Sequence, residues 1–382
     1  MINISKLWCG TPGSMDHLRY GRTTHHRPVV VWSTTRRCNL NCVHCYSKSE
    51  NNIYPNELTT NEAKAFVKDI AEFGVSVLLF SGGEPLLRQD LLEVARFASE
   101  AGIRAVLSTN GTLITETIAR QLKNAGFSYV GISLDGIGET NDKFRGKEKA
   151  FELAVEGVRN CLKAGVKTGL RFTVTKYNFK DVPEIFNFVE TEEIPRVCFY
   201  HLAYVGRGTK ITNDDLTHEE TRAFMDYVLE KAEIFHKKAL NTEILTVDNH
   251  ADAAYLYLKL KEKDPKKAED ALELLKLNGG NSSGTGIACV DSNGYVHPDQ
   301  FWQHYSLGNI RTRRFSQIWT DNSEPLLQAL RNRKIHLIGK CAECRFLDIC
   351  NGNLRVRAEA VYGDTWASDP ACYLTPEETR SN

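Results

Sequence analysis

Three cysteines in one short segment have the spacing of ligands to a single iron–sulfur cluster. Cys38, Cys42 and Cys45 form the pattern CxxxCxxC. Thiolates at this spacing can reach one four-iron cluster from a single loop, and three of them leave the fourth iron without a protein ligand. An iron with an open position can bind and reduce a small molecule. A zinc site, which more often has paired CxxC units, or a group of buried thiols is the alternative.

The pattern resembles the signature of the radical S-adenosylmethionine (SAM) enzymes, in which it follows a hydrophobic strand. The resemblance implies that the open iron chelates the methionyl group of SAM and that cleavage of SAM yields a 5′-deoxyadenosyl radical. His44 and Tyr46 flank Cys45 and are candidates for SAM contact. In this family the residue before the last cysteine lies near the adenine, usually through its backbone, so His44 need not be a metal ligand.

A glycine-rich turn follows the second expected strand. It contains Gly82, Gly83, Glu84 and Pro85. Glycine allows a ligand to approach the backbone closely, and a carboxylate can pair with an ammonium group. The segment is similar to the GGEP motif of the same family, which holds the amino group of SAM. Glycine-rich turns are common after strands, so this motif alone is moderate evidence for a SAM site. It becomes strong evidence together with the cysteine segment upstream.

Polar residues stand at the ends of the third and fourth expected strands. Ser108 and Asn110 lie at the end of the third, and Ser133 and Asp135 lie at the end of the fourth. Hydroxyl, amide and carboxylate groups at strand ends suit the ribose hydroxyls and the methionyl part of SAM. The alternative is turn chemistry, because Asn-Gly and Asp-Gly are ordinary turn formers.

A second group of cysteines lies near the end of the sequence and consists of Cys341, Cys344, Cys350 and Cys372. Four thiolates complete the coordination of a 4Fe–4S cluster, so such a cluster would bind no SAM. Zinc with four thiolates is the alternative. The spacing resembles the auxiliary-cluster domain called SPASM.

The opening of that domain departs from the family pattern. A SPASM domain normally opens with a cysteine, a glycine and a second cysteine after V-x-P. Here Cys289 and Gly294 keep the frame, but Asp299 stands where the second cysteine would be. We therefore expect one auxiliary cluster, and Cys289 is an open candidate for a ligand.

The stretch from His297 to Tyr305 is dense in polar, aromatic and proton-transferring groups. His297 or His304 could bind an iron or transfer a proton, and a buried, hydrogen-bonded histidine is the alternative. Together with residues 306–310, this stretch closely resembles radical SAM enzymes that trim side chains of sirohaem-derived tetrapyrroles.

That resemblance implies removal of acetate side chains from 12,18-didecarboxysirohaem to give Fe-coproporphyrin III. The segments Ile4–Gly10 and Leu18–Arg22 favour this activity over that of a haem d1 relative, which acts on propionates of the same substrate. A peptide-modifying SPASM enzyme is a further alternative. The implied partners are an iron-tetrapyrrole substrate and a low-potential electron donor such as ferredoxin or flavodoxin.

Arginines are the expected partners of carboxylates on both small molecules. Arg171, in the fifth expected strand, could pair with the SAM carboxylate, and Arg145 could do the same or fix a loop. The candidates for substrate carboxylates, without assigned roles, are Arg36, Arg37, Arg207, Arg311, Arg355 and Arg357.

Apolar strands alternate with amphipathic helices along the first two thirds of the sequence. Such alternation favours a parallel sheet. The expected strands are 29–33, 75–80, 104–108, 129–134, 167–174 and 196–202, and the expected helices are 59–73, 90–101, 115–125, 150–164, 182–189 and 217–237. Six such units suit an α/β fold with a partial (β/α)6 TIM-like barrel, the usual core of radical SAM enzymes, whose active site lies at the C-terminal ends of the strands.

We therefore predict four segments. Residues 1–27 form an N-terminal segment, and residues 28–240 form the partial barrel. Residues 241–284 are a helical insert and linker, and residues 285–382 form a C-terminal SPASM-like iron–sulfur domain.

Composition limits the classes of function. Lys+Arg and Asp+Glu both number 48 among 382 residues, so the formal charge of zero argues against a generic nucleic-acid binder. We expect no membrane span, because no run of eighteen apolar residues occurs. The start lacks the features of a signal peptide, which predicts a cytoplasmic protein. In that reducing compartment the 11 cysteines favour metal ligands over disulfides.

Overall fold

The computed structural model describes residues 1–10 and 27–380, which form two compact units. Of these residues, unit 1 holds 1–10, 172–282 and 332–380, and unit 2 holds 27–171 and 283–331. The segment Leu18–Arg22, on which part of the substrate prediction rests, lies outside the described residues. The predicted division into four segments differs from this one and stays a prediction.

Unit 2 is built on a mixed sheet. Parallel pairing joins neighbouring strands from β2 to β6, and β9 is parallel to the other edge of β2. The strands β10 and β11 continue the sheet in antiparallel register. The strands are β2 (Val29–Thr35), β3 (Val77–Gly82), β4 (Arg104–Thr109), β5 (Phe127–Ser133), β6 (Thr168–Val174, shared with unit 1), β9 (Ile287–Val290), β10 (Tyr295–His297) and β11 (Gly308–Asn309).

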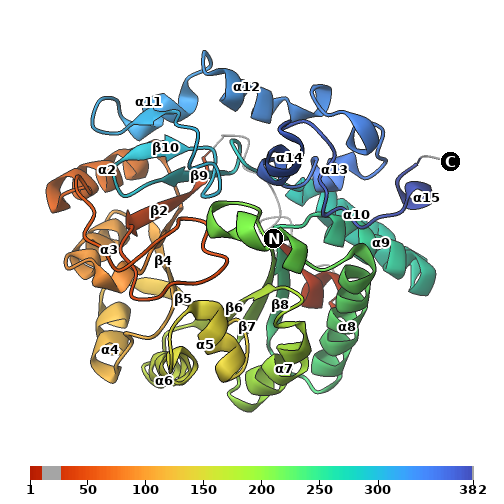
Figure 1. Ribbon diagram of the computed structural model, residues 1–382, viewed down its shortest axis with the longest axis horizontal. Helices are drawn as coiled ribbons and strands as arrows, with labels where there is room; N and C mark the ends of the chain where they lie inside the picture. The colour runs from red at the N-terminus through yellow and green to blue at the C-terminus, as the bar shows by residue number, and fades with distance from the viewer. Residues whose placement is uncertain (11–26, 381–382) are drawn as a thin grey trace. The chain divides into compact units, whose positions relative to one another are not determined.

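The helices of unit 2 alternate with its strands along the chain, and some of them pack on β4 and β5 (Figure 1). They are α2 (Thr60–Phe73), α3 (Leu91–Glu100), α4 (Glu116–Asn124), α5 (Glu139–Arg145), α6 (Ala150–Lys163), α11 (Phe315–Thr320) and α12 (Pro325–Arg331). Local chemistry sets the ends of α2. Thr59 and Glu62 form the predicted capping box, and Gly74 ends the helix with φ at 91°, where glycine has no Cβ to clash.

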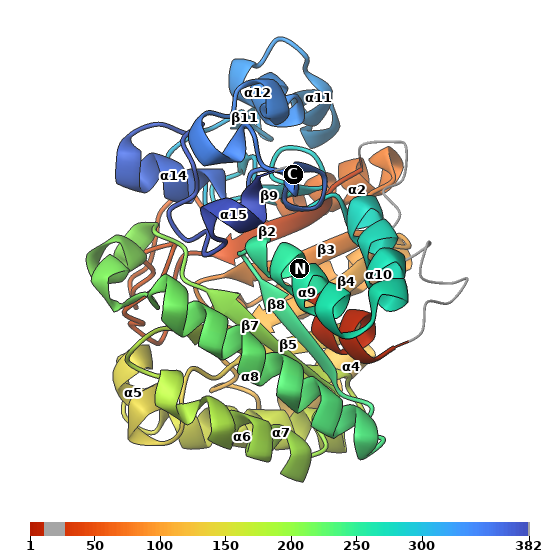
Figure 2. The same ribbon diagram turned by 90° about the vertical axis from the view of Figure 1, so that its right-hand side faces the viewer.

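In unit 1, β7 (Arg196–His201) and β8 (Glu243–Val247) are parallel, and β1 (Ile2–Asn3) is antiparallel to β8. In Figure 2, the helices α9 and α10 lie side by side. The helices of this unit are α7 (Val182–Thr191), α8 (His218–Lys237), α9 (Ala251–Lys263), α10 (Pro265–Asn278), α13 (Leu347–Cys350), α14 (Arg355–Tyr362) and α15 (Pro376–Thr379).

The predicted elements between residues 29 and 237 are present, with their ends shifted by a few residues. Two regions differ from the predictions. Residues 241–284, predicted as a helical insert, contain β8 before α9 and α10. The N-terminal segment, for which no element was predicted, contains β1 and a π-helix over Ser5–Cys9. Both strands are short, so they lack the apolar run that marks a buried strand in a sequence.

Aromatic side chains pack against one another in the core of each unit. In unit 2 the ring of Phe80 lies 5.7 Å from that of Trp32 and 5.4 Å from that of Phe127. In unit 1 the ring of Phe199 lies 5.2 Å from Phe186 and 5.5 Å from Phe224. Such packing stabilises strands whose C-terminal ends carry polar residues.

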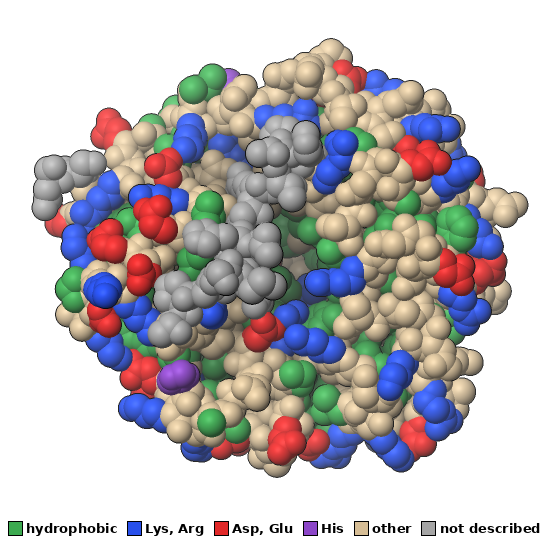
Figure 3. Space-filling model, turned by 180° about the vertical axis from the view of Figure 1, so that it is seen from behind, with side chains coloured by type: hydrophobic (Ala, Val, Ile, Leu, Met, Phe, Trp, Pro, Cys, Tyr) green, Lys and Arg blue, Asp and Glu red, His purple; other side chains and the backbone are tan. Residues whose placement is uncertain are grey.

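The surface carries both signs of charge. Lys and Arg side chains and Asp and Glu side chains are both spread over the face shown in Figure 3. This distribution agrees with the balanced composition. Within residues 1–10 and 27–380, no helix is both long enough and apolar enough to cross a bilayer.

Candidate functional site

The loop that carries the first three cysteines is fixed at both ends by backbone hydrogen bonds. It leaves β2, and the N–H of Cys38 donates to the carbonyl of Glu50 at 2.9 Å, which closes the loop. The N–H of Asn41 donates to the carbonyl of Arg145, the last residue of α5, at 3.1 Å. Cys38 and Cys42 are buried. The loop therefore presents its thiols from a rigid frame.

The three thiols lie close enough to affect one another electrostatically. Burial raises the pKa of Cys38 to about 12, and the neighbouring Cys42 and Cys45 add to this shift. Burial also raises the pKa of Cys42, which the Arg145 guanidinium opposes. Because iron binds thiolate, cluster insertion must release these protons.

Three nitrogen donors, one from the cysteine loop itself and two from other parts of unit 2, point at two of the sulfur atoms. The backbone N–H of Leu40 and the side-chain amide of Asn110 lie 3.4 Å and 3.9 Å from Cys38 Sγ. Arg145 Nη1 lies 3.7 Å from Cys42 Sγ. Donors of this kind stabilise the negative charge of a thiolate-bound cluster and tune its potential.

A four-iron cluster and a single zinc ion make different demands on the thiolates that hold them. Within the described part of the chain, no three Cys, His, Asp or Glu side chains are grouped so that they could hold one ion. A zinc ion needs all its thiolates at about 2.3 Å from one atom. In a four-iron cluster each thiolate binds a different iron, so the sulfur atoms stand farther apart.

Gly82 and Gly83 bring the glycine-rich turn against the cysteine loop. A Cβ on Gly83 would lie 2.2 Å from the carbonyl oxygen of Arg37, and one on Gly82 would lie 2.4 Å from that of Thr35. The N–H of Gly83 donates to Thr35 at 2.7 Å, and that of Glu84 donates to Arg37 at 2.8 Å. Gly82 and Gly83 are therefore required because they pack against the protein's own backbone, whereas the sequence suggested close approach of a ligand.

Glu84 is fully buried and holds the end of β4. Its carboxylate accepts hydrogen bonds from Thr109 Oγ1 at 2.7 Å, Asn110 N at 2.8 Å and Leu86 N at 3.1 Å. Burial raises its pKa, and these three bonds oppose the shift. Pro85 is also buried and begins a short 3₁₀ helix. The motif thus links the cysteine loop to the neighbouring strand end.

Asp135 lies in a buried network behind Cys42. Its carboxylate forms an ion pair with Arg145, and His44 Nε2 lies 3.7 Å from it. The ring of His44 stacks on Phe144 with 4.6 Å between centroids. Burial would lower the pKa of Arg145, but Asp135 and Cys42 raise it. The sequence left two roles for Arg145, and the structure gives it contacts to a cysteine and to Asp135.

The other predicted SAM contacts lie on neighbouring strands. Ser133 is in register with Arg171 across β5 and β6, and Ser108 is in register with Gly131 across β4 and β5. Both serines are half-buried. A Cβ on Gly131 would lie 2.9 Å from Arg171 Cδ, so this glycine makes room for the arginine side chain.

Tyr46 points away from the cysteine loop toward β3. Its hydroxyl lies 3.3 Å from Ser81 Oγ, and its ring meets Phe301 edge-on at 5.6 Å. Burial raises the pKa of Tyr46 to about 12. The hydroxyl therefore stays protonated and can act as a hydrogen-bond donor.

The two predicted histidines have opposite environments. His297 is only 2% exposed, and its Nδ1 lies 2.7 Å from the carbonyl oxygen of Tyr305. His304 is exposed, with its ring stacked on Trp302 at 5.5 Å. The aromatic neighbours of His304 in the sequence favour burial of that side chain. In the structure the opposite holds, because His297 is the buried histidine and His304 is the exposed one.

Cys289 and Asp299 lie inside unit 2. Cys289 is fully buried in β9, opposite His297 in β10, and its sulfur is 4.0 Å from Ser33 Oγ. Burial raises its pKa. Asp299 accepts hydrogen bonds from Ser283 Oγ and from the N–H of Phe301. Both side chains are therefore packed in the protein.

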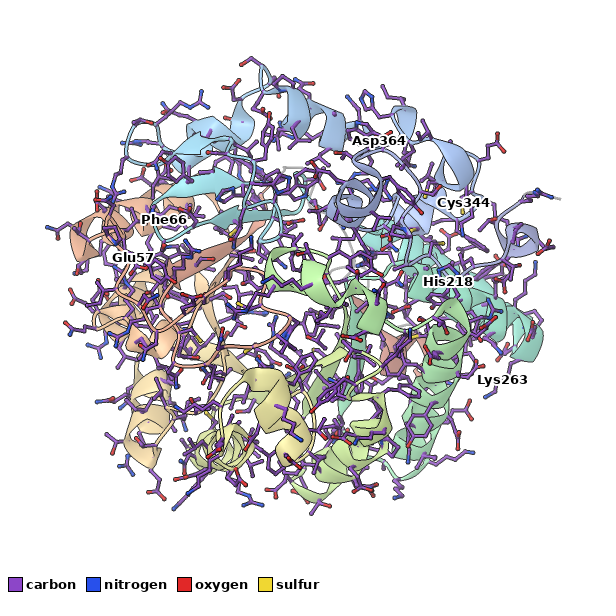
Figure 4. All side chains as sticks on the ribbon, in the orientation of Figure 1. Glu57, Phe66, His218, Lys263, Cys344 and Asp364 are labelled. Atoms are coloured by element: carbon purple, nitrogen blue, oxygen red, sulfur yellow. The ribbon has the colours of Figure 1, made fainter. Side chains whose placement is uncertain are left out.

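The four C-terminal cysteines come together in unit 1. Burial raises the pKa of Cys350 well above its usual value, and the nearby thiols of Cys372, Cys341 and Cys344 raise it further. Burial likewise raises the pKa of Cys372 to about 11. Cys344 lies in the loop before α13 (Figure 4). Four thiols in one neighbourhood fit a fully coordinated cluster.

A polar cluster at the C-terminal end of β7 has no sequence motif that predicts it. His201 ends that strand and meets Asp252 of α9, which also meets Tyr373. The three residues lie far apart in the sequence, and the only signal was that His201 falls near the end of an expected strand. Asp252 and Tyr373 carried no motif that could have predicted the contact.

Comparisons with known proteins agree with this site. A sequence model of the radical SAM superfamily matches residues 32–189, and one of the SPASM iron–sulfur cluster-binding domain matches residues 282–345. Fe-coproporphyrin III synthase of Methanosarcina barkeri is 55% identical over 99% of this chain and 98% of its own length. Pre-heme d1 synthase of Dinoroseobacter shibae is 44% identical over 92% and 88%.

Solved structures show the same fold. The SAM-bound structure of SuiB from Streptococcus suis has a TM-score of 0.71 at 19% identity, covering 91% of this chain and 77% of SuiB. The structure of anSMEcpe with AdoMet and a peptide has a TM-score of 0.69 at 20% identity, covering 90% and 94%. The predicted α/β fold with a C-terminal iron–sulfur domain is confirmed.

Proposed function

The chain belongs to the radical SAM superfamily, and we propose that it removes the acetate side chains of 12,18-didecarboxysirohaem to give Fe-coproporphyrin III. The observation that carries this proposal is the 55% identity to Fe-coproporphyrin III synthase, which extends over nearly the whole of both chains. The cofactors of this radical SAM enzyme are SAM and two 4Fe–4S clusters. They supply a 5′-deoxyadenosyl radical for hydrogen abstraction from an acetate methylene of the substrate.

We assign the cysteines to the two clusters by unit. Cys38, Cys42 and Cys45 of unit 2 would hold the cluster that binds SAM. The auxiliary cluster would be held by Cys341, Cys344, Cys350 and Cys372 of unit 1. Support comes from the proximity of the thiols within each group, because Cys42 and Cys45 lie near Cys38, and Cys341, Cys344 and Cys372 lie near Cys350.

The residues of unit 2 bind and orient SAM in this proposal. Glu84 pairs with the ammonium group, and Arg171 pairs with the carboxylate. Ser108, Asn110, Ser133, Asp135, His44 and Tyr46 stand at the same edge of the sheet for the remaining polar groups. Gly82, Gly83 and Pro85 keep this edge rigid against the cysteine loop, so that the reacting carbon is held against one C–H bond.

The proposal includes two partners and a location. The substrate is an iron tetrapyrrole, and an electron comes from a low-potential donor such as ferredoxin or flavodoxin. Buried thiols that must become ligands require a reducing compartment, for which the cytoplasm is the prediction.

The second candidate is removal of propionates from the same substrate. The 44% identity to pre-heme d1 synthase favours it over unrelated chemistries. The two activities leave different side chains on the macrocycle, so the mass of the product separates them. The higher identity to the acetate-removing relative places this candidate second.

The experiment uses anaerobically reconstituted protein with SAM, dithionite and 12,18-didecarboxysirohaem. Mass spectrometry should find Fe-coproporphyrin III and 5′-deoxyadenosine. A product with altered propionates would support the second candidate. Deoxyadenosine without any change in the tetrapyrrole would overturn both substrate assignments. Protein in which Cys42 is replaced by Ala is the control for background reduction of SAM.

A further inference from the structure

The side chain of His201 is held by the buried carboxylate of Asp252, which is held in turn by the buried hydroxyl of Tyr373. Its Nε2 lies 2.9 Å from Asp252 Oδ2, and the hydroxyl of Tyr373 donates to Asp252 Oδ1 at 2.7 Å. Asp252 is fully buried, and His201 retains 5% exposure. The imidazole is therefore fixed in orientation through a carboxylate that is itself fixed by a phenol.

This contact determines which ring nitrogen is available. Because a carboxylate accepts hydrogen bonds, Nε2 carries a proton, and Nδ1 carries the lone pair whenever the ring is neutral. Within the described residues, Nδ1 of His201 has no hydrogen-bond partner. Burial would lower the pKa of His201, but Asp252 more than offsets this and raises it. A carboxylate in this position makes the other nitrogen a stronger ligand, as in histidines that bind metals.

A purely structural role does not explain this choice of residues. A buried ionic pair is often no more stabilising than apolar residues of the same size. His201 also ends β7, which is parallel to β8, and ligands of parallel α/β sheets bind at the C-terminal strand ends. By contrast, Nδ1 of His297 already bonds the carbonyl of Tyr305, and that side chain is more completely buried.

We propose that Nδ1 of His201 binds the iron of the tetrapyrrole substrate as an axial ligand, while Asp252 and Tyr373 orient the imidazole. The proposal rests on the proposed function, because the ligand is an iron tetrapyrrole. It assigns to His201 the iron-binding role that the sequence suggested for His297 or His304. An imidazole is an ordinary axial ligand of haem-type iron, and coordination would fix the height and tilt of the macrocycle.

The test uses the full chain with both clusters loaded and with histidine labelled with ¹⁵N. Ferric Fe-coproporphyrin III is the probe, and electron–nuclear double resonance reads nitrogen bound to its iron. We expect a ¹⁵N coupling in the parent and its loss in His201→Gln, which can keep the hydrogen bond to Asp252. In His201→Gly, added imidazole should restore the Soret position of the parent. His236→Ala, at an exposed position on α8, is the matched control and should behave as the parent.

Replacement of Asp252, which orients the imidazole of His201, should weaken binding of the probe without abolishing it. Asp252→Asn should weaken binding of the probe by about 10- to 100-fold, because outer partners of a metal-bound histidine usually have effects of this size. An unchanged ¹⁵N coupling in His201→Gln would overturn the assignment, and so would a parent that converts the substrate without any such coupling. A parent that neither binds the probe nor converts didecarboxysirohaem would instead overturn the proposed function.

Discussion

The two groups of cysteines differ in what their surroundings contact. In unit 2 the side chains of Asn110 and Arg145 point their N–H groups at the sulfur atoms of Cys38 and Cys42. In unit 1 the sulfur atoms of Cys344 and Cys372 have backbone donors, from Phe346 and Leu374, and the nearby cation contacts carbonyl oxygens instead of sulfur. Lys340 Nζ donates to the carbonyl oxygens of Cys372 and Leu374, at 3.2 Å and 3.1 Å.

This difference follows from the number of thiolates. A cluster with three thiolates keeps one iron open, and its neighbours must tune the potential at which that iron reduces SAM. A cluster with four thiolates has no open iron for SAM, so its neighbours take no part in that reaction. The first group is therefore expected to respond strongly to changes in side chains near sulfur, and the second group weakly.

The largest expected effect comes from removing one thiolate of the open group. Cys42→Ala should lower the iron content from about eight to about four atoms per chain, because each cluster holds four. Cleavage of SAM should be abolished. Iron analysis and release of 5′-deoxyadenosine measure the two effects. Cys161→Ala is the matched control, since Cys161 is equally buried but lies on α6. Normal SAM cleavage by Cys42→Ala would refute the assignment of this cluster.

The second-largest effect should come from loss of the buried carboxylate of Glu84 in the glycine-rich turn. Glu84→Gln removes a charged partner of the SAM ammonium group, worth about 1.5–3 kcal/mol, or about one to two decades of affinity. Calorimetry of SAM binding to the protein with both clusters provides the measurement. Glu57→Gln, on the segment before α2 (Figure 4), should change the affinity less. An unchanged dissociation constant in Glu84→Gln would exclude Glu84 from the SAM site.

Features set by neighbouring residues were predictable from the sequence. The capping box of Thr59 and Glu62 and the stop at Gly74 depend on residues three or four positions apart, and the structure contains them. The first cysteine group depends on one short loop, so its spacing carried the information. The outer strands β1 and β8 were missed because five or fewer residues show no clear period.

Contacts between distant residues were not predictable. Arg145 reaches Cys42 across more than a hundred positions, and Asp252 reaches Tyr373 across a similar separation. No local pattern encodes such a pair, because the folded sheet alone brings the partners together. For the same reason, the sequence could not tell that His297 is buried and that His304 is exposed.

A smaller effect is expected from the arginine beside Cys42. Reduction adds negative charge to a cluster, so the positive charge and N–H group of Arg145 favour the reduced form. Arg145→Gln should lower the potential of the SAM-binding cluster by about 40 mV, if the contact is worth about 1 kcal/mol. Redox titration followed by electron paramagnetic resonance measures this. Asp135→Asn should shift the potential upward, since it removes the opposing charge. Equal potentials in all three proteins would show that Arg145 only fixes the loop.

The smallest effect should come from the cation beside the closed group. Lys340 is half-exposed and bonds carbonyl oxygens, yet its charge opposes the rise in the pKa of Cys372. Exposed charges contribute about 0.2–1 kcal/mol, and at the low end of that range Lys340→Met should lower the auxiliary potential by about 10 mV. At 1 M salt, where the screening length is about 3 Å, this shift should vanish while that of Arg145→Gln persists. If Lys340→Met produced the larger, salt-resistant shift, the closed cluster would be the more finely tuned of the two, and the distinction between the two groups would be reversed.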